Sequence, residues 1–166
     1  MCYFKVKFVN LKKGGSMSKI ISFVNSDWIR TKSKPGLKNQ KERYSLCPSC
    51  KNYKPGEESN CDIQKALAQI EGLDMKVPVF ECEHCILRDD VDKSLFECYE
   101  HHGNLVMVRK ELKGKHAKMC LCHCCISFHP DEPNNCFKAQ ELFKLCVKHG
   151  LVTPVFECPC IIPDSA

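Results

Sequence analysis

Cysteine constrains this chain more than any other feature. The sequence has 15 cysteines among 166 residues, and several of them stand as pairs separated by two residues. Cysteine at this density in a short chain indicates either a disulfide scaffold or a set of metal sites. The odd number and the paired spacing favour metal ligation over complete oxidative pairing. We therefore expect metal ions to replace much of the hydrophobic core that a larger domain would build.

The sequence carries no evident export or membrane signal. Its first apolar run, residues 20–24, is too short for the hydrophobic region of a signal peptide and has no small-residue cleavage site after it. No apolar run approaches the length of a transmembrane helix. We therefore expect a cytoplasmic protein that does not contact a membrane, with a disulfide-bonded secreted protein as the alternative.

An internal repeat shows which cysteines belong together. Residues 46–61 align without a gap with residues 121–136, at an offset of 75. Farther on, the block Pro-Val-Phe-Glu-Cys at 78–82 recurs at 154–158, at an offset of 76. So many identities in register indicate a duplicated unit. The fold class that this predicts is a small, metal-stapled α+β protein with two tandem repeats.

Each repeat predicts the same succession of a cysteine knuckle, a polar loop, a helix and a short strand. Asn60 and Asn135 are suitable helix N-cap residues at the ends of the two loops. Helical spacing then places Ile63, Leu67 and Ile70 on one face in the first copy, and Phe137, Leu142, Leu145 and Cys146 on one face in the second. Gly150 is the expected C-cap of the second helix. The strands predicted after them, Val77 to Cys82 and Val152 to Cys158, contain proline, which is typical of sheet edges.

The chain divides into five expected segments. Lys-Lys-Gly-Gly at 12–15 can be encoded by a bacterial ribosome-binding site a few nucleotides before the codon of Met17, so Met17 is a candidate natural start; a genuine flexible N-terminus is the alternative. The expected boundaries are a disordered leader at 1–16, a basic segment at 17–45, the first repeat at 46–86, a connecting segment at 87–119 and the second repeat at 120–166.

The duplicated cysteines fit two structural zinc sites. A Cys-x2-Cys turn directs two sulfurs at one ion, and a structural Zn²⁺ takes four such ligands in a closed tetrahedron. A third cysteine, in the first helical turn, is stabilised as a thiolate by the helix N-terminus. The predicted ligands are Cys47, Cys50, Cys61 and Cys82 in the first repeat, and Cys122, Cys125, Cys136 and Cys158 in the second.

Two questions about these sites stay open at the level of sequence. Cys85 and Cys160 are alternatives to Cys82 and Cys158 as fourth ligands, because they also recur at the offset of 75. An iron-sulfur cluster is an alternative to zinc, although the compact ferredoxin spacing is absent.

The connecting segment predicts a helix from about Asp89 to Gly103 and then a strand at 105–108. Its spacing also permits a third, less favoured zinc site, for which scattered histidines and a spare thiol are the simpler interpretation. The residues of that third site are Cys98, His101, His116 and Cys120.

Positive charge is concentrated at the N-terminal end. Residues 1–46 contain 11 Lys and Arg against two acids, whereas the rest of the chain contains 14 against 18. A basic stretch within residues 30–43 could contact phosphate, although a solvated linker is the favoured interpretation. Its basic residues are Arg30, Lys32, Lys34, Lys38, Lys41 and Arg43.

The second repeat resembles a loose group of short cysteine-rich proteins from bacterial and phage genomes. The resemblance covers residues 114–163, notably Cys-Leu-Cys-His-Cys-Cys at 120–125, Asn-Asn-Cys at 134–136 and Thr-Pro-Val-Phe-Glu-Cys-Pro at 153–159, and residues 46–85 echo it faintly. It implies a microbial metal protein and implies no activity.

The sequence favours a binding function over catalysis. It has no glycine-rich phosphate loop, no Gly-x-Ser-x-Gly elbow and no His-Glu-x-x-His helix. The expected function is that of a non-enzymatic zinc protein of bacterial or phage origin that binds a host or phage protein in a regulatory or anti-defence role. A zinc-dependent nucleic-acid-binding regulator is the alternative.

Overall fold

The computed structural model describes residues 33–72 and 75–164. The expected leader at 1–16, the start at Met17 and the basic residues Arg30 and Lys32 lie outside the described residues. In the described part of the chain, no helix is both long enough and apolar enough to cross a bilayer.

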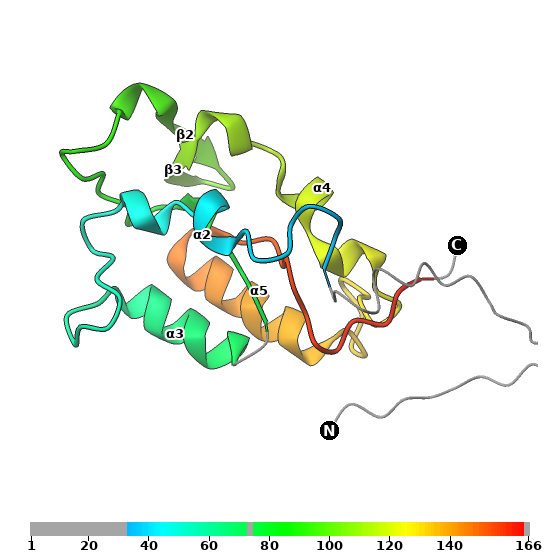
Figure 1. Ribbon diagram of the computed structural model, residues 1–166. Coiled ribbons are helices and arrows are strands. Elements are labelled where there is room, and N and C mark those ends of the chain that lie inside the picture. Colours follow the sequence, from blue (N-terminus) through cyan, green and yellow to red (C-terminus); the bar gives the residue numbers. More distant parts are fainter. Residues whose placement is uncertain (1–32, 73–74, 165–166) are drawn as a thin grey trace, which may run out of the picture.

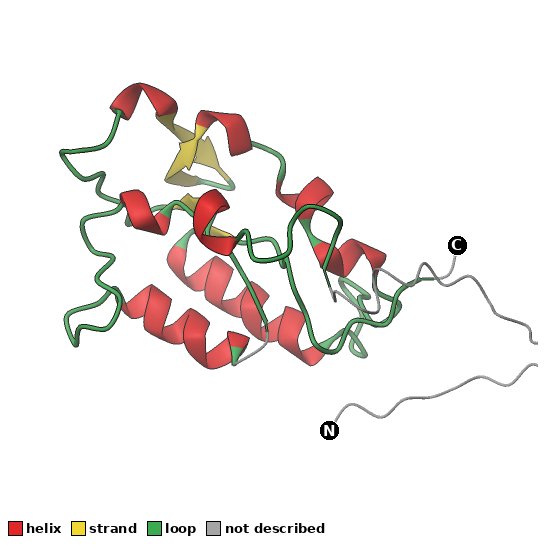
Figure 2. Ribbon diagram, in the orientation of Figure 1, coloured by secondary structure: helices red, strands yellow, loops and turns green. Residues whose placement is uncertain are grey.

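Two helices pack beside a small antiparallel sheet (Figures 1 and 2). The sheet has four strands in the order β2-β3-β1-β4. The strands are β1 (Glu81–Cys82), β2 (Phe96–His101), β3 (Asn104–Arg109) and β4 (Leu151–Val152), and the helices are α2 (Lys41–Tyr44), α3 (Asp62–Glu71), α4 (His116–Met119) and α5 (Phe137–His149). Helices α3 and α5 contact each other. This mixture of helices and an antiparallel sheet confirms the α+β class.

The core lies between the sheet and these two helices. Its main cluster includes Leu46, Leu67 and Val79, which are at most 1% exposed. A second cluster is formed by Leu37, Phe80, Leu112 and Phe156. Phe80 and Phe156 meet edge to face with their ring centroids 5.9 Å apart. Apolar packing therefore contributes to the fold beside the cysteines.

The two long helices form where the sequence predicts them, but they begin differently. The N-cap residues are Cys61 and Cys136, and neither side chain caps its helix. The predicted N-caps, Asn60 and Asn135, lie one residue earlier. Their Oδ1 atoms accept hydrogen bonds from backbone N–H groups six residues upstream, at 2.8 and 2.9 Å. The asparagines therefore close the polar loops, because a short amide side chain competes for local backbone donors.

The predicted helical faces are right except at Phe137. Ile63, Leu67 and Leu142 are buried, and Ile70, Leu145 and Cys146 pack partly buried against the core. Phe137 is 73% exposed, because five residues at about 100° each rotate it well away from Leu142. Gly150 caps α5 in the left-handed conformation, as predicted.

The strands are shorter than the sequence predicts. Only Glu81 and Cys82 of the first block, and Leu151 and Val152 near the second, form ladder pairs. Proline at positions 78 and 154 lacks the N–H that a continuous ladder would need. Strand β4 lies at a sheet edge, whereas β1 lies between β3 and β4, so the prediction of an edge strand is wrong for β1.

The connecting segment corrects another prediction. The expected helix from Asp89 to Gly103 is absent from this described segment, and residues 96–101 form β2, which pairs with the predicted strand β3. His102 and Gly103 both have positive φ, at 49° and 81°. Positive φ at both central residues is the mark of a two-residue hairpin turn. Gly103, which the sequence predicted to end a helix, is therefore a residue of the turn between β2 and β3.

The basic segment is folded over the part that the structure describes. Leu37 is buried with Phe80 and Phe156, which overturns the favoured interpretation of a solvated linker for residues 33–45. Lys41 binds the buried carboxylate of Glu71. Lys34 Nζ donates to the carbonyl of Lys118 at 2.8 Å. Lys38 and Arg43 stay exposed.

Candidate metal centres: two cysteine clusters

Five cysteines of the first repeat surround one small cavity. The cavity has a volume of about 20 Å³, and its cysteines are Cys47, Cys50, Cys61, Cys82 and Cys85. Tyr53, Gln64 and His84 also line it. A space of this size holds about one water molecule, and hence one metal ion. All four predicted ligands of the first site and the alternative fourth ligand therefore border the same cavity.

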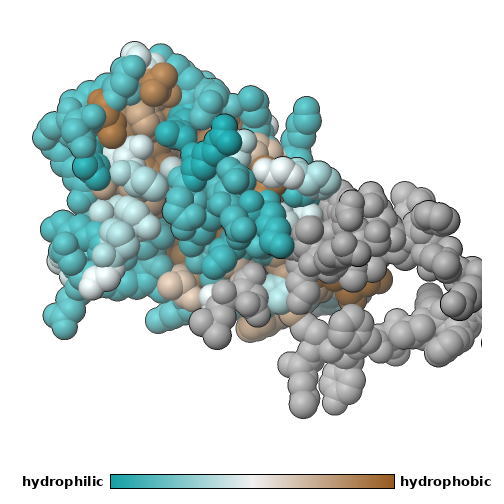
Figure 3. Space-filling view, in the orientation of Figure 1, coloured by the Kyte–Doolittle hydropathy of each residue, from teal (hydrophilic) through white to brown (hydrophobic). Residues whose placement is uncertain are grey.

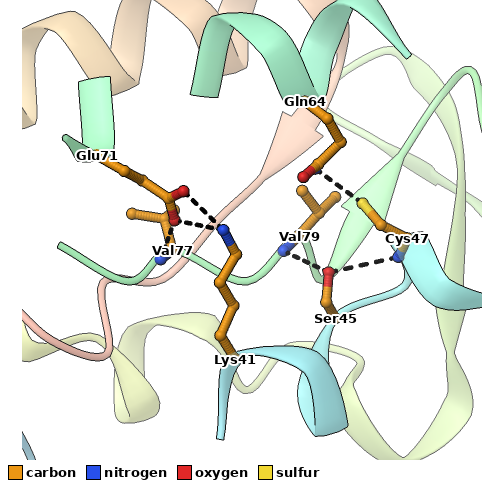
Figure 4. Close-up of polar contacts among 7 residues, drawn as sticks. All are labelled: Lys41, Ser45, Cys47, Gln64, Glu71, Val77 and Val79. Carbon is orange, nitrogen blue, oxygen red and sulfur yellow. Dashed lines mark hydrogen bonds and ion pairs between the residues drawn. The ribbon is translucent and has the colours of Figure 1, made fainter. Parts of the chain in front are cut away.

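Hydrogen bonds from both sides fix Cys47. It begins a one-turn 3-10 helix, Cys47–Ser49. Ser45 Oγ accepts from the backbone N–H groups of Cys47 at 3.4 Å and Val79 at 3.3 Å, and so joins the knuckle to the segment before β1. Gln64 Nε2 donates to Cys47 Sγ at 3.0 Å from helix α3 (Figure 4). No sequence pattern singles out Gln64, because its contact with Cys47 depends on tertiary packing.

The knuckle is also joined to the chain that follows Cys85. The backbone N–H of Cys50 closes the turn on Cys47 O at 2.9 Å, and Lys51 N–H donates to Ile86 O at 2.8 Å. Cys50 forms an isolated antiparallel bridge with Leu87. These interactions join the knuckle to residues 86 and 87, which directly follow Cys85.

The acidities of the first cluster differ among its members. Burial raises the pKa of Cys47 to about 11 and that of Cys82 to about 12. A hydrogen bond from Cys85 lowers the pKa of Cys50 to about 6, and the same bond raises the pKa of Cys85. In the metal-free protein, Cys50 is therefore the preferred thiolate of this pair.

The cysteines of the second repeat also influence one another, but Cys160, the alternative fourth ligand there, is disulfide-bonded and is therefore not a free thiol. Hydrogen bonding with Cys120 raises the pKa of Cys122, and burial and the charges of Cys158 and Cys136 raise it further. Burial also raises the pKa of Cys158, as do the charges of Cys136 and Cys125. These electrostatic influences link Cys122 with Cys136 and Cys158, and Cys158 with Cys125.

Cys120 is an additional member of the second cluster. The bond with Cys122 lowers its pKa to about 6, and Val155 N–H donates to its Sγ at 3.4 Å. The sequence assigned Cys120 to the less favoured third site. Its counterpart at the offset of 75 is Ser45, whose Oγ accepts from Val79 N–H as Cys120 Sγ accepts from Val155 N–H.

Backbone hydrogen bonds recur between the two regions at the offset seen in the sequence. The N–H of Leu46 donates to Val79 O, and that of Leu121 donates to Val155 O, both at 2.7 Å. The bond from Cys61 to Asn52 is matched by that from Cys136 to Ser127, and the bond from Lys51 to Ile86 by that from Ile126 to Ile162. The bridge between Cys50 and Leu87 is matched by that between Cys125 and Pro163.

The residues of the third predicted site are not all brought together. Cys98 and His101 are three positions apart in β2, and side chains at odd separations lie on opposite faces of a strand. Cys98 is exposed, with its Sγ 3.9 Å from Met107 Sδ. His101 instead binds Glu81 and lies near His116. The Cys-x2-His and His-x3-Cys spacing permitted this site, but the strand geometry of β2 separates Cys98 from His101.

No group of three or more His, Cys, Asp or Glu side chains in residues 33–72 and 75–164 stands in a geometry ready for a metal ion. The chain matches no protein-family model, no curated protein and no solved structure with which it was compared. The function is therefore argued from the cysteine clusters themselves.

Proposed function

We propose that this protein is a non-enzymatic metal protein that holds two structural zinc ions and acts by binding another protein. The observation that carries the proposal is the single cavity of about 20 Å³ bordered by five cysteines. Thiolates are soft ligands that suit Zn²⁺, and four of them close its coordination sphere. The proposed ligands are Cys47, Cys50, Cys61 and Cys82, and Cys122, Cys125, Cys136 and Cys158.

We expect zinc binding to draw the cysteine sulfurs together, because they are not already arranged as a tetrahedral site. The thiols of the metal-free protein repel one another when ionised and share protons, so their sulfurs have no reason to converge. A bound Zn²⁺ deprotonates its thiol ligands and draws the sulfurs to about 2.3 Å. Small movements of the knuckle and of the Cys82 to Cys85 turn would provide this convergence.

The position of these sites supports a structural role. Cys47 and Cys50 belong to the knuckle, Cys61 begins α3 and Cys82 lies in β1. One ion would tie all three elements together. The recurring hydrogen bonds of the second region support the same role for a second ion, and a closed four-sulfur site leaves no position for substrate.

Exposed apolar side chains support protein binding. On α5, Phe137 is 73%, Phe143 68% and Val147 65% exposed. The face of the molecule in Figure 3 is mostly hydrophilic, with separate hydrophobic patches. Aromatic side chains that a fold leaves exposed are typical anchors of protein interfaces.

Nucleic-acid binding is less well supported. Lys41 is engaged with Glu71 and Lys34 with a backbone carbonyl. Of the basic residues proposed for phosphate contact in the described part, this leaves Lys38 and Arg43 exposed. A steep loss of nucleic-acid affinity with salt would favour this alternative over a protein partner.

Chelation tests the structural role of the metal. Removing a structural zinc removes folding free energy on the order of 10 kcal/mol per site. We expect a strong chelator at neutral pH to abolish protease resistance and to change the circular dichroism spectrum, and added zinc to restore both. Unchanged resistance after verified metal removal would contradict the proposal. If the anaerobically purified protein is brown and absorbs visible light, the bound group is an iron-sulfur cluster instead of zinc.

A further inference from the structure

A buried carboxylate organises a second cluster of ionisable side chains, which contains no cysteine. Glu81 in β1 is 0% exposed. Tyr99 Oη donates to Glu81 Oε1 at 2.7 Å, and His101 Nδ1 is hydrogen-bonded to Glu81 Oε2. Because a buried glutamate is tolerated only when its oxygens are paired, these two donors account for its position. In return, Glu81 fixes the ring of His101.

The contact with Glu81 decides which nitrogen of His101 is available. Nδ1 is used by the carboxylate and lies 3.2 Å from Tyr99 Oη. In a neutral ring whose Nδ1 carries the proton, Nε2 presents a lone pair. Pairing of one ring nitrogen with a carboxylate is the arrangement that orients metal-ligating histidines and makes the other nitrogen more basic.

A second imidazole with an unused nitrogen lies beside His101. The ring centroids of His101 and His116 are 6.0 Å apart. His116 Nδ1 is buried and has no hydrogen-bond partner within the described residues. Burial lowers the pKa of His116, which keeps its ring neutral. An unpaired buried ring nitrogen is costly unless it binds something.

We propose that His101 and His116 bind one divalent transition-metal ion through His101 Nε2 and His116 Nδ1, at a site separate from both cysteine clusters. Imidazole nitrogen suits Zn²⁺, Ni²⁺ and Co²⁺. With a metal–nitrogen distance of about 2.0–2.1 Å, two rings on one tetrahedral ion have centroids roughly 5 Å apart. The observed distance between the two ring centroids, 6.0 Å, is about 1 Å longer than this.

The site is an open one. Two imidazoles leave the remaining coordination positions to water or to an incoming ligand, which agrees with the lack of any three-residue metal group in the described residues. The ring of His102 stacks on that of His101 with centroids 4.4 Å apart and shields one face of it. An open transition-metal site is the kind that exchanges its ion, unlike a closed four-sulfur site.

Substoichiometric Co²⁺, added to the full chain as purified, tests the site by NMR of the histidine rings. We expect paramagnetic broadening of the His101 and His116 ring signals before that of His129, a half-buried loop residue of the second repeat. His101→Ala and His116→Ala should each weaken Co²⁺ binding at this site at least about tenfold, and His129→Ala should leave it unchanged.

Two results would overturn the inference. One is equal broadening of all the histidine rings, and the other is undiminished broadening near His102 in both the His101→Ala and His116→Ala variants. Neither result bears on the cysteine clusters, because tightly bound zinc is counted in the same sample before Co²⁺ is added. Conversely, a failure of the two-zinc proposal would leave the ring broadening as an independent observation.

Discussion

Gln64 Nε2, in the first turn of α3, donates a hydrogen bond at 3.0 Å to Sγ of Cys47, the first residue of the knuckle. A donor of this kind favours the thiolate over the thiol, because hydrogen bonds to charged groups are stronger than those between neutral groups. Cys47 is otherwise held as a thiol by its burial, which raises its pKa to about 11. Gln64 is therefore a positioning residue for the first cluster.

Replacing Gln64 by Leu should weaken metal binding at the first cluster. The lost bond to a thiolate costs about 1–2 kcal/mol, or roughly tenfold in affinity. The measurement is a competition titration of zinc against a coloured chelator. Gln69→Leu is the matched control, because it makes the same change on the exposed face of α3 and should leave the affinity unchanged. If the wild type and the Gln64→Leu variant bound zinc with equal affinity, Gln64 would not be a positioning residue for the first cluster.

Breaking the ion pair between Lys41 and Glu71 should destabilise the fold. The buried Glu71 carboxylate accepts from Lys41 Nζ at 2.6 and 2.7 Å and from Val77 N–H at 2.6 Å (Figure 4). Lys41→Met leaves that carboxylate without its counter-ion, at a cost of about 3 kcal/mol in the free energy of unfolding. Urea denaturation at constant zinc measures this.

The exposed pair of Lys65 and Asp62, 3.1 Å apart, provides the comparison for that experiment. Lys65→Met should cost less than about 0.5 kcal/mol, because surface ion pairs contribute little. If the two variants lost the same stability, the ion pair at Glu71 would not anchor the basic segment to the core.

Zinc binding should release protons and should weaken as the pH falls. Cys47 and Cys82, with pKa values of about 11 and about 12, carry protons in the metal-free protein at pH 7. Both must lose them to bind Zn²⁺, whereas Cys50, with its pKa of about 6, is already largely ionised. Acid competes with the metal for the thiolates, so affinity rises with pH from about 5 to 9. A pH indicator in weak buffer counts the released protons, and binding without acidification would show that thiolates are not the ligands.

The sequence predicted those parts of the fold that depend on local periodicity and capping. The helical spacing of Ile63 and Leu67 predicted α3. Gly150 predicted the end of α5, because glycine readily adopts the positive φ of a helix C-cap. The strand at 105–108 was also predictable, since its β-branched residues favour a sheet.

Other elements depend on contacts that a local pattern does not record. The sequence pattern of residues 96–101 is compatible with either a helix or a strand. These residues form a strand because the turn at His102 and Gly103 pairs them with β3. Contacts between residues distant in the sequence also account for the burial of Leu37, for the hydrogen bond from Gln64 to Cys47 and for the position of His116 beside His101. The cavity bordered by Cys47, Cys50, Cys61 and Cys82, by contrast, joins residues that the repeat in the sequence had already grouped.

The metal content of the purified protein tests the central proposal most directly. Mass spectrometry of the native protein should find two zinc ions per chain, and Cys50→Ser and Cys125→Ser should each lose one of them. Cys98→Ser, which changes an exposed thiol outside both clusters, should keep both. Wild-type protein purified without chelators that contains no zinc, or Cys50→Ser and Cys125→Ser variants that both keep two ions, would contradict it.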